Sequence, residues 1–149
     1  MKYTFSQTFS VPAREAFRWA VNYQPGDFAL MGVHGKREII KLSDDSYILK
    51  ETLHHGTART RSKLIRIDPV RMLYTNTHIT GPAKHSQFIY EIVPEGENRS
   101  KLQFTGLLLY RSERKLTKKE IARVASEERK FDSDIWKRLA RAMKADLRN

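Results

Sequence analysis

Cysteine is absent from the 149-residue sequence, so the chain forms no disulfides and has no thiol chemistry. No apolar run approaches the roughly 18 to 20 residues of a membrane span, so we expect no transmembrane helix. The first residues, Met1 to Phe5, already alternate like a strand, and no signal peptide is visible. By default we expect a cytoplasmic protein.

Several motifs that define enzyme classes are also missing. The chain has no nucleophile elbow, no glycine loop that would cradle a phosphate, and no dinucleotide-binding fingerprint. None of the five histidines has the spacing of a zinc motif, and several ligands would have to converge to hold a metal. We therefore predict neither a metal site nor a cofactor.

Charge of one sign is in excess. The 28 lysines and arginines outnumber the 17 acids and give a formal net charge of +11, which would suit a nucleic acid, an anionic membrane surface or an acidic ligand. The basic residues are scattered along the chain and form no aromatic-basic cluster on one face. We favour a basic, well-solvated surface with at most a weak attraction to anionic surfaces, and we do not expect nucleic acid as a partner.

The longest predicted element is a helix at the end of the chain. Thr117-Lys118-Lys119-Glu120 has the pattern of a capping box, in which the threonine hydroxyl and the glutamate carboxylate bind free amides at a helix start. Because no proline or glycine follows, we predict a helix from Thr117 to Leu147, about 45 Å long at about 1.5 Å rise per residue.

One broad stripe of this helix is apolar at a helical period. The stripe comprises Ile121, Val124, Ala125, Ile135, Trp136, Leu139, Ala142 and Met143. Glu128 and Asp132 lie near its centre, with Phe131 at one margin. Ionised acids are unfavourable to bury unless they are paired, hydrogen-bonded or wet. Either the helix covers a cavity that holds water or ligand, or this part of it overhangs into solvent.

The rest of the chain reads as strands with two short helices. Alternating aromatics predict a strand over residues 2–10, and Pro12 and the Gln24-Pro25-Gly26-Asp27 break bound the first helix, with a second short helix or turn after it. Six strands follow, separated by polar or glycine- and proline-containing turns; they span residues 36–42, 47–55, 57–67, 71–80, 84–93 and 100–111. The length and the absence of a linker predict a single domain over residues 1–149.

This order predicts an α+β fold in which a curved antiparallel sheet of about seven strands grips the long helix. Strand parity assigns the faces. Phe88 and Tyr90 share one face, as do Leu102 and Phe104. In residues 57–65 we expect the basic row outside and the small row inside, where it leaves room; the basic row is Arg59, Arg61 and Lys63, and the small row Ala58, Thr60, Ser62 and Leu64.

The order of elements and the stretch Thr8-Phe9-Ser10-Val11-Pro12-Ala13-Arg14-Glu15-Ala16-Phe17-Arg18-Trp19 resemble the START/Bet v 1-like superfamily, also called SRPBCC. The stretch is similar to the strand-to-helix entry of that family, and the resemblance in topology covers essentially the whole chain. It implies a helix-grip fold and a hydrophobic cavity between sheet and terminal helix, which in such proteins holds lipids, sterols, polyketides or plant hormones. Some members are cyclases or other enzymes. The glycine-rich loop of the plant allergen branch is missing, since the corresponding hairpin is Lys41-Leu42-Ser43-Asp44-Asp45-Ser46.

Candidate site residues follow from these faces. Glu128 and Asp132 are adjacent on one helix face, and desolvation with like-charge repulsion would raise the pKa of at least one, giving candidate catalytic acids or bases. The alternative is that they reach water at the cavity mouth or bind an arginine. Glu51 is a third inward acid, for which a structural ion pair is the favoured reading. The predicted ligand-binding set is Glu51, Tyr74, Phe88, Tyr90, Phe104, Glu128, Phe131, Asp132, Ile135 and Trp136.

The strand over 71–80 has two faces between which the sequence does not decide. One carries Tyr74, Asn76 and His78, which would offer directional hydrogen bonds to a ligand if it faced inward.

Three functions remain open. We favour a binding or carrier protein for a hydrophobic or amphipathic small molecule, because apolar burial in a cavity supplies most of the affinity. The alternative is a cyclase- or dehydratase-like enzyme that uses a cavity carboxylate as general base. The third is an interaction module that uses its basic surface. The sequence does not decide whether the protein is an enzyme, and it identifies neither the ligand nor the oligomeric state.

Overall fold

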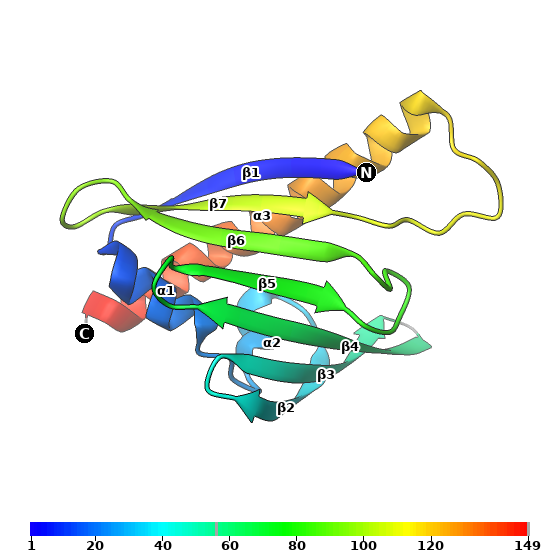
Figure 1. The fold of residues 1–149 in the computed structure, drawn as a ribbon. Coiled ribbons are helices and arrows are strands. Elements are labelled where there is room, and N and C mark those ends of the chain that lie inside the picture. The colour runs from blue at the N-terminus through cyan, green and yellow to red at the C-terminus, as the bar shows by residue number, and fades with distance from the viewer. Residues whose placement is uncertain (56, 149) are drawn as a thin grey trace.

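Seven strands form one antiparallel sheet in the order β1-β7-β6-β5-β4-β3-β2 (Figure 1). The computed structural model describes residues 1–55 and 57–148. For residues 55, 57 and 58 it describes the backbone only. The strands are β1 (Lys2–Phe9), β2 (Gly35–Ser43), β3 (Ser46–His55), β4 (Thr57–Asp68), β5 (Leu73–His78), β6 (Gln87–Pro94) and β7 (Ser100–Leu107). The helices are α1 (Ala13–Val21), α2 (Asp27–Met31) and α3 (Lys118–Arg148).

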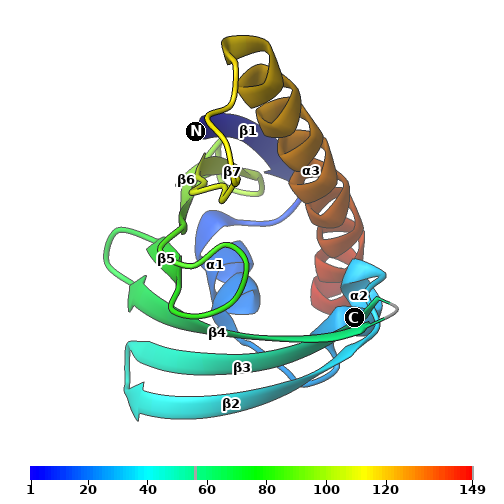
Figure 2. The ribbon, with the colours of Figure 1, turned by 90° about the vertical axis from the view of Figure 1, so that its right-hand side faces the viewer.

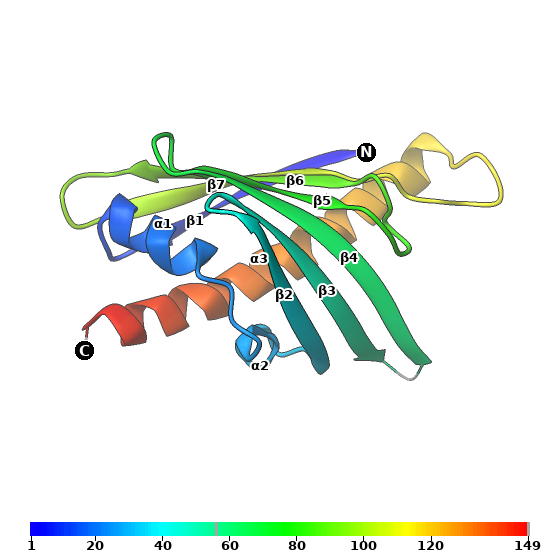
Figure 3. The same ribbon diagram turned by 60° about the horizontal axis from the view of Figure 1, so that its bottom comes forward.

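The sheet curves around α3, and the predicted helix-grip α+β fold is confirmed. Figure 2 shows β2, β3 and β4 turning away from β1 and β7, with α3 standing across the open side of the curve. Figure 3 shows all three helices on this concave side, with α1 near the C-terminal half of α3 and α2 below it. The Arg138 guanidinium of α3 donates to the Met31 carbonyl at 2.8 Å and thereby ties α2 to α3.

The start of α3 is the predicted capping box. The Glu120 amide donates to Thr117 Oγ1 at 3.2 Å, and the Thr117 amide donates to Glu120 Oε2 at 2.8 Å. These bonds satisfy amides that have no partner within the helix, which is why the helix begins here. None of the helices that the structure describes is long and apolar enough to span a lipid bilayer.

The core lies on the concave side of the sheet. Trp136 and Met143 of α3 pack with Phe9 of β1, Phe17 of α1 and Leu102 of β7, all of them buried. At Gly106 the chain approaches Tyr3 closely: a Cβ at that position would lie 2.5 Å from the Tyr3 ring. Because Gly106 has no side chain, the Tyr3 ring can lie against the backbone of β7 at this point.

The prediction that the last strand reaches Arg111 is wrong. The strand β7 ends at Leu107, which pairs with Lys2 of β1 and with Gln87 of β6. Both neighbouring strands begin at these residues. Past them the chain leaves the sheet, although the Leu108 amide still donates to the Met1 carbonyl at 2.8 Å and the Leu109 amide to Ser86 Oγ at 2.9 Å. The central strand is also shorter than predicted, because Met72 adopts a positive φ of 52° before β5 begins.

Candidate functional site

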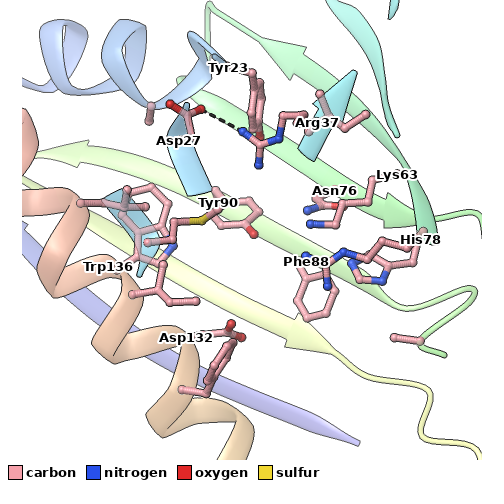
Figure 4. A pocket seen from close by; sticks show the side chains of 18 of the residues that line it. Tyr23, Asp27, Arg37, Lys63, Asn76, His78, Phe88, Tyr90, Asp132 and Trp136 are labelled. Carbon is pink, nitrogen blue, oxygen red and sulfur yellow. Dashed lines mark hydrogen bonds and ion pairs between the residues drawn. The ribbon is translucent and has the colours of Figure 1, made fainter. Parts of the chain in front are cut away.

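A cavity of about 1080 Å³ lies between the concave face of the sheet and α3. Its wall combines side chains from the sheet, from α1 and the segment that follows it, and from the middle of α3 (Figure 4). Tyr74, Phe88 and Tyr90 form the apolar part on the sheet, and Ile135 and Trp136 form it on the helix. Charged and polar side chains, among them Arg37, Asn76 and Asp132, form much of the remaining wall, so the cavity has an aromatic part and a polar part.

The structure brings eight of the ten predicted ligand-binding residues together around this cavity. They are Tyr74, Phe88, Tyr90, Glu128, Phe131, Asp132, Ile135 and Trp136. Phe131 is 57 % exposed, so it lies at the margin and not deep inside. That any of them contacts a ligand remains a prediction.

Phe104 and Glu51 do not form part of the wall. Phe104 faces the same side as Tyr90 but is covered by rings from β1, with Phe5 stacked on it at a centroid distance of 4.5 Å and Tyr3 at 5.8 Å. Glu51 is fully buried behind the basic side chains that do reach the cavity. The strand β1 is far from Phe104 in sequence, so parity within β7 could not reveal this cover.

The two acids of α3 face the cavity. The Tyr3 hydroxyl donates to Asp132 Oδ2 at 2.6 Å, which links β1 to the helix. Burial raises the pKa of Asp132 and outweighs the lowering by the Tyr3 hydrogen bond and by the charges of Lys63 and Arg61. Burial, followed by the neighbouring charge of Asp132, also raises the pKa of Glu128. Of the two carboxylates, Asp132 is therefore the one whose position is fixed by a hydrogen bond.

Replacement of Tyr3 by phenylalanine is expected to raise the pKa of Asp132 further, because the ionised carboxylate loses a donor while its burial persists. The lost bond should also lower the free energy of unfolding by about 1–2 kcal/mol. Carboxyl-carbon NMR titration measures the first effect and urea unfolding the second. Tyr110→Phe is the matched control, since Tyr110 is 53 % exposed. An unchanged Asp132 titration would show that Tyr3 does not donate to it in solution.

A cluster of charged residues forms the other end of the cavity wall, and the prediction that its basic residues face outward is wrong. The row containing Arg61 and Lys63 points inward, to the cavity, and not outward as predicted. Ser62 and Leu64 of the supposed inner row lie on the opposite face, and Thr60 is exposed; the Ala58 side chain lies outside the described residues.

The reason is Glu51, which the strand register places next to the basic side chains. Arg37 of β2 and Arg61 of β4 are the direct partners of Glu51 on either side. Arg37 Nη2 lies 3.0 Å from Glu51 Oε1, whereas Arg61 Nε and Lys63 Nζ lie 2.7 and 3.0 Å from Oε2. We predicted that Glu51 forms a structural ion pair; the structure shows that it pairs with three cations. The signal in the sequence was Glu51: a buried acid needs cationic partners, and this need could have predicted that the basic row faces inward.

The cluster shifts the pKa values of its members. Burial raises the pKa of Glu51, but the charges of Lys63, Arg61 and Arg37 outweigh it and lower the pKa to about 2. Burial and the charge of Arg61 lower the pKa of Lys63 to about 8, although Glu51 opposes the shift. Burial, with the charges of Lys63 and Arg61, lowers the pKa of His78 to about 3. At neutral pH Glu51 is ionised, Lys63 is mostly charged and His78 is neutral.

The open question about β5 is answered by burial. Tyr74, Asn76 and His78 are buried and line the cavity, so this face is the inner one. Tyr74 and Tyr90 stack with parallel rings at a centroid distance of 4.4 Å. Asn76 Oδ1 is the one buried side-chain atom of the described residues that has no hydrogen-bond partner. A buried acceptor without a partner in a cavity wall is a position where a ligand donor gains a bond.

No group of three His, Asp or Glu side chains in residues 1–55 and 57–148 converges in a way that could hold a metal ion.

Comparison with solved structures shows the fold of the chain. Over 99 % of its length and 95 % of the other chain it is similar to the Zhui aromatase/cyclase from Streptomyces sp. R1128, with 16 % identity and a TM-score of 0.80. A START superfamily protein from Mycobacterium smegmatis matches at 10 % identity and a TM-score of 0.77, covering 97 % of both chains. Ara h 8.0201 matches at 16 % identity and a TM-score of 0.68, covering 97 % of this chain and 98 % of that one.

The chain therefore has the helix-grip fold of these START and Bet v 1-like structures, and the resemblance in fold that the sequence indicates is confirmed. No protein-family model and no curated protein matches the sequence. The solved structures include both cyclases and other proteins, so the fold alone does not choose among the functions.

Proposed function

We propose that the protein binds or carries a hydrophobic or amphipathic small molecule, lipid-, sterol- or polyketide-like, in the cavity between the sheet and α3. The observation that carries this proposal is the cavity itself, with a volume of about 1080 Å³ and with Tyr74, Phe88, Tyr90 and Trp136 in its wall. Burial of apolar ligand surface contributes roughly 25 cal/mol per Å² before association costs, so a ligand that covers these rings gains most of its affinity from them. The neighbours of this fold include an aromatase/cyclase and a START superfamily protein, which agrees with a ligand-holding role.

Native mass spectrometry of the purified protein tests the proposal. We expect a mass above that of the 17.4 kDa chain, and loss of the extra mass on denaturation as an extractable apolar molecule appears. The variant Ile135→Trp, which adds a ring to the cavity wall, should retain less of the molecule. Leu147→Trp is the matched control, because Leu147 lies on the same helix outside the cavity wall. Equal retention by both variants would show that the molecule binds elsewhere.

A second function, catalysis of a cyclase or dehydratase type, is supported by one observation. Asp132 is a cavity carboxylate whose pKa is raised, and a general base works best when its pKa is near the working pH. The same NMR titration discriminates the two functions. A measured pKa near neutrality for Asp132 would favour a general base, whereas an ordinary value would leave Asp132 the role of orienting a polar group of the ligand.

A further inference from the structure

The charged cluster at the sheet end of the cavity carries more positive than negative charge. Arg37, Arg61 and Lys63 supply three cations, and Glu51 supplies one anion. The only further acid paired with the cluster among the described residues is Asp27, which lies 2.9 Å from Arg37 Nη1. Within this ion-paired group three cations against two anions leave an excess of one positive charge, since His78 is neutral at neutral pH. Arg59 also lines the cavity, but it is exposed to solvent and is not counted in the group.

All three nitrogens of the Arg37 guanidinium bond to Glu51 or Asp27, so the excess positive charge resides on Arg61 and Lys63. Arg37 donates to Glu51 with Nε and Nη2 and to Asp27 with Nη1, and its side chain is 4 % exposed. Arg61, by contrast, meets Glu51 only through Nε, so its two terminal amino groups have no partner among the described residues. Lys63 has Glu51 as its one ion-pair partner there and keeps further N–H groups to donate.

Arg61 and Lys63 both face the cavity. Both residues line it, and their side chains are 27 % and 11 % exposed. Figure 4 shows Lys63 grouped with Asn76 and His78 on the sheet, while Asp132 and Trp136 project from α3 on the other side. No ion pair within the described residues joins Lys63 or Arg61 to Asp132, which is instead bonded to Tyr3. Asp132 therefore leaves the donors of Arg61 and Lys63 unbonded, although the charges of these two cations lower its pKa.

We propose that the ligand is an amphipathic monoanion, an organic acid whose carboxylate binds Arg61 and Lys63 and whose apolar body lies along the aromatic wall. This inference rests on the proposed function and specifies its ligand class. One negative charge balances the excess on the cluster, and hydrogen bonds between charged partners are about twice as strong as neutral ones. The free Asn76 Oδ1 beside the cluster accepts a hydrogen bond from a hydroxyl or N–H group near the acid.

Probes that differ only in the head group test the charge, and two probe bodies test the shape. In the first series dodecanoate, dodecanol and dodecylamine are titrated by calorimetry at pH 7, below their aggregation limits. In the second series the carboxylate of 2-naphthylacetic acid is compared with 2-(2-naphthyl)ethanol. We expect each acid to bind at least about tenfold more tightly than its alcohol, and dodecylamine to bind most weakly, since a close like-charge contact opposes it.

The variant Lys63→Met should remove the preference for the acid while the affinity for the alcohol stays unchanged, which also shows that the cavity is intact. Lys50→Met is the matched control: Lys50 is exposed on β3, and its loss lowers the net charge equally without changing the cavity. If Lys63→Met fails to fold, Arg61→Met is expected to have the same effect.

The outcomes separate the two proposals. Acid and alcohol of equal affinity would overturn the anionic ligand and leave the cavity as a binding site for neutral molecules. A preference for the acid that survives in Lys63→Met and in Arg61→Met, or that Lys50→Met also removes, would assign it to the overall charge of the protein and overturn this inference. No binding of either series by a folded protein would overturn both the ligand class and the proposed function.

Discussion

Replacement of Glu51 by glutamine is expected to lower the free energy of unfolding by about 3–5 kcal/mol, because removing one partner of a buried ion pair leaves uncompensated charge inside the protein. Glu51 has no exposed surface and faces three cations within 3.0 Å. Glutamine keeps the shape and one carbonyl acceptor but removes the negative charge. The side chains of Arg37 and Lys63 would remain buried without it.

Urea unfolding followed by circular dichroism measures this loss. Glu38→Gln is the matched control, since Glu38 lies on the neighbouring strand β2 and is exposed, and we expect a change within about 0.5 kcal/mol for it. A similarly small loss for Glu51→Gln would show that water hydrates the cluster in solution.

The same carboxylate gives a pH dependence with a definite sign. Its pKa is about 2 in the folded protein against an ordinary value of 4.5, so the folded state binds the proton less readily than the unfolded state. The stabilisation is fully present above pH 4.5 and is lost as the pH falls towards 2. The stability difference between wild type and Glu51→Gln should therefore shrink over this range. A constant difference would mean that the charge of Glu51 is not the source of the effect.

Replacement of Trp136 by alanine is expected to lower the free energy of unfolding by about 3–5 kcal/mol, the range observed when a buried large aromatic side chain is truncated. Trp136 is 6 % exposed and packs between the Phe9 ring, at a centroid distance of 6.1 Å, and the Tyr90 ring, at 5.9 Å. It thereby joins α3 to β1 and to β6. Its removal would enlarge a cavity that already exists, so little collapse can compensate for the lost contacts.

The matched control is Phe131→Ala on the same helix, for which we expect a change within about 0.5 kcal/mol because the ring is 57 % exposed. Both variants are compared by urea unfolding. Equal losses for Trp136→Ala and Phe131→Ala would mean that α3 is held by its polar contacts, such as the Arg138 bond to Met31, and not by the tryptophan.

Local patterns were enough to predict the fold. The Thr117–Glu120 capping box and the uninterrupted stretch after it predicted α3, and the turn residues predicted the number and order of the strands. The alternation of Phe88 and Tyr90 and the stripe around Trp136 predicted much of the cavity wall. These features depend on neighbours along the chain, which a sequence displays directly.

The charged end of the cavity depends on neighbours across strands. Parity groups Arg59, Arg61 and Lys63 on one face but does not say which face is concave. The general preference of cations for solvent then favours the wrong answer. Only the register that places Arg37, Glu51 and Arg61 side by side makes inward cations favourable. That register is set by two hairpins together, and it becomes visible only once the sheet is assembled.

Gly106 has a consequence for which substitutions the chain can accept. Its backbone lies against the Tyr3 ring, and the hydroxyl of that ring holds the Asp132 carboxylate at 2.6 Å. Even a methyl group at position 106 would displace the ring and move its hydroxyl away from the acid. Substitution of Gly106 on β7 is thus limited by the contact between Tyr3 and Asp132 of α3. A glycine, which has no side chain, therefore helps to set the pKa of an acid in the cavity.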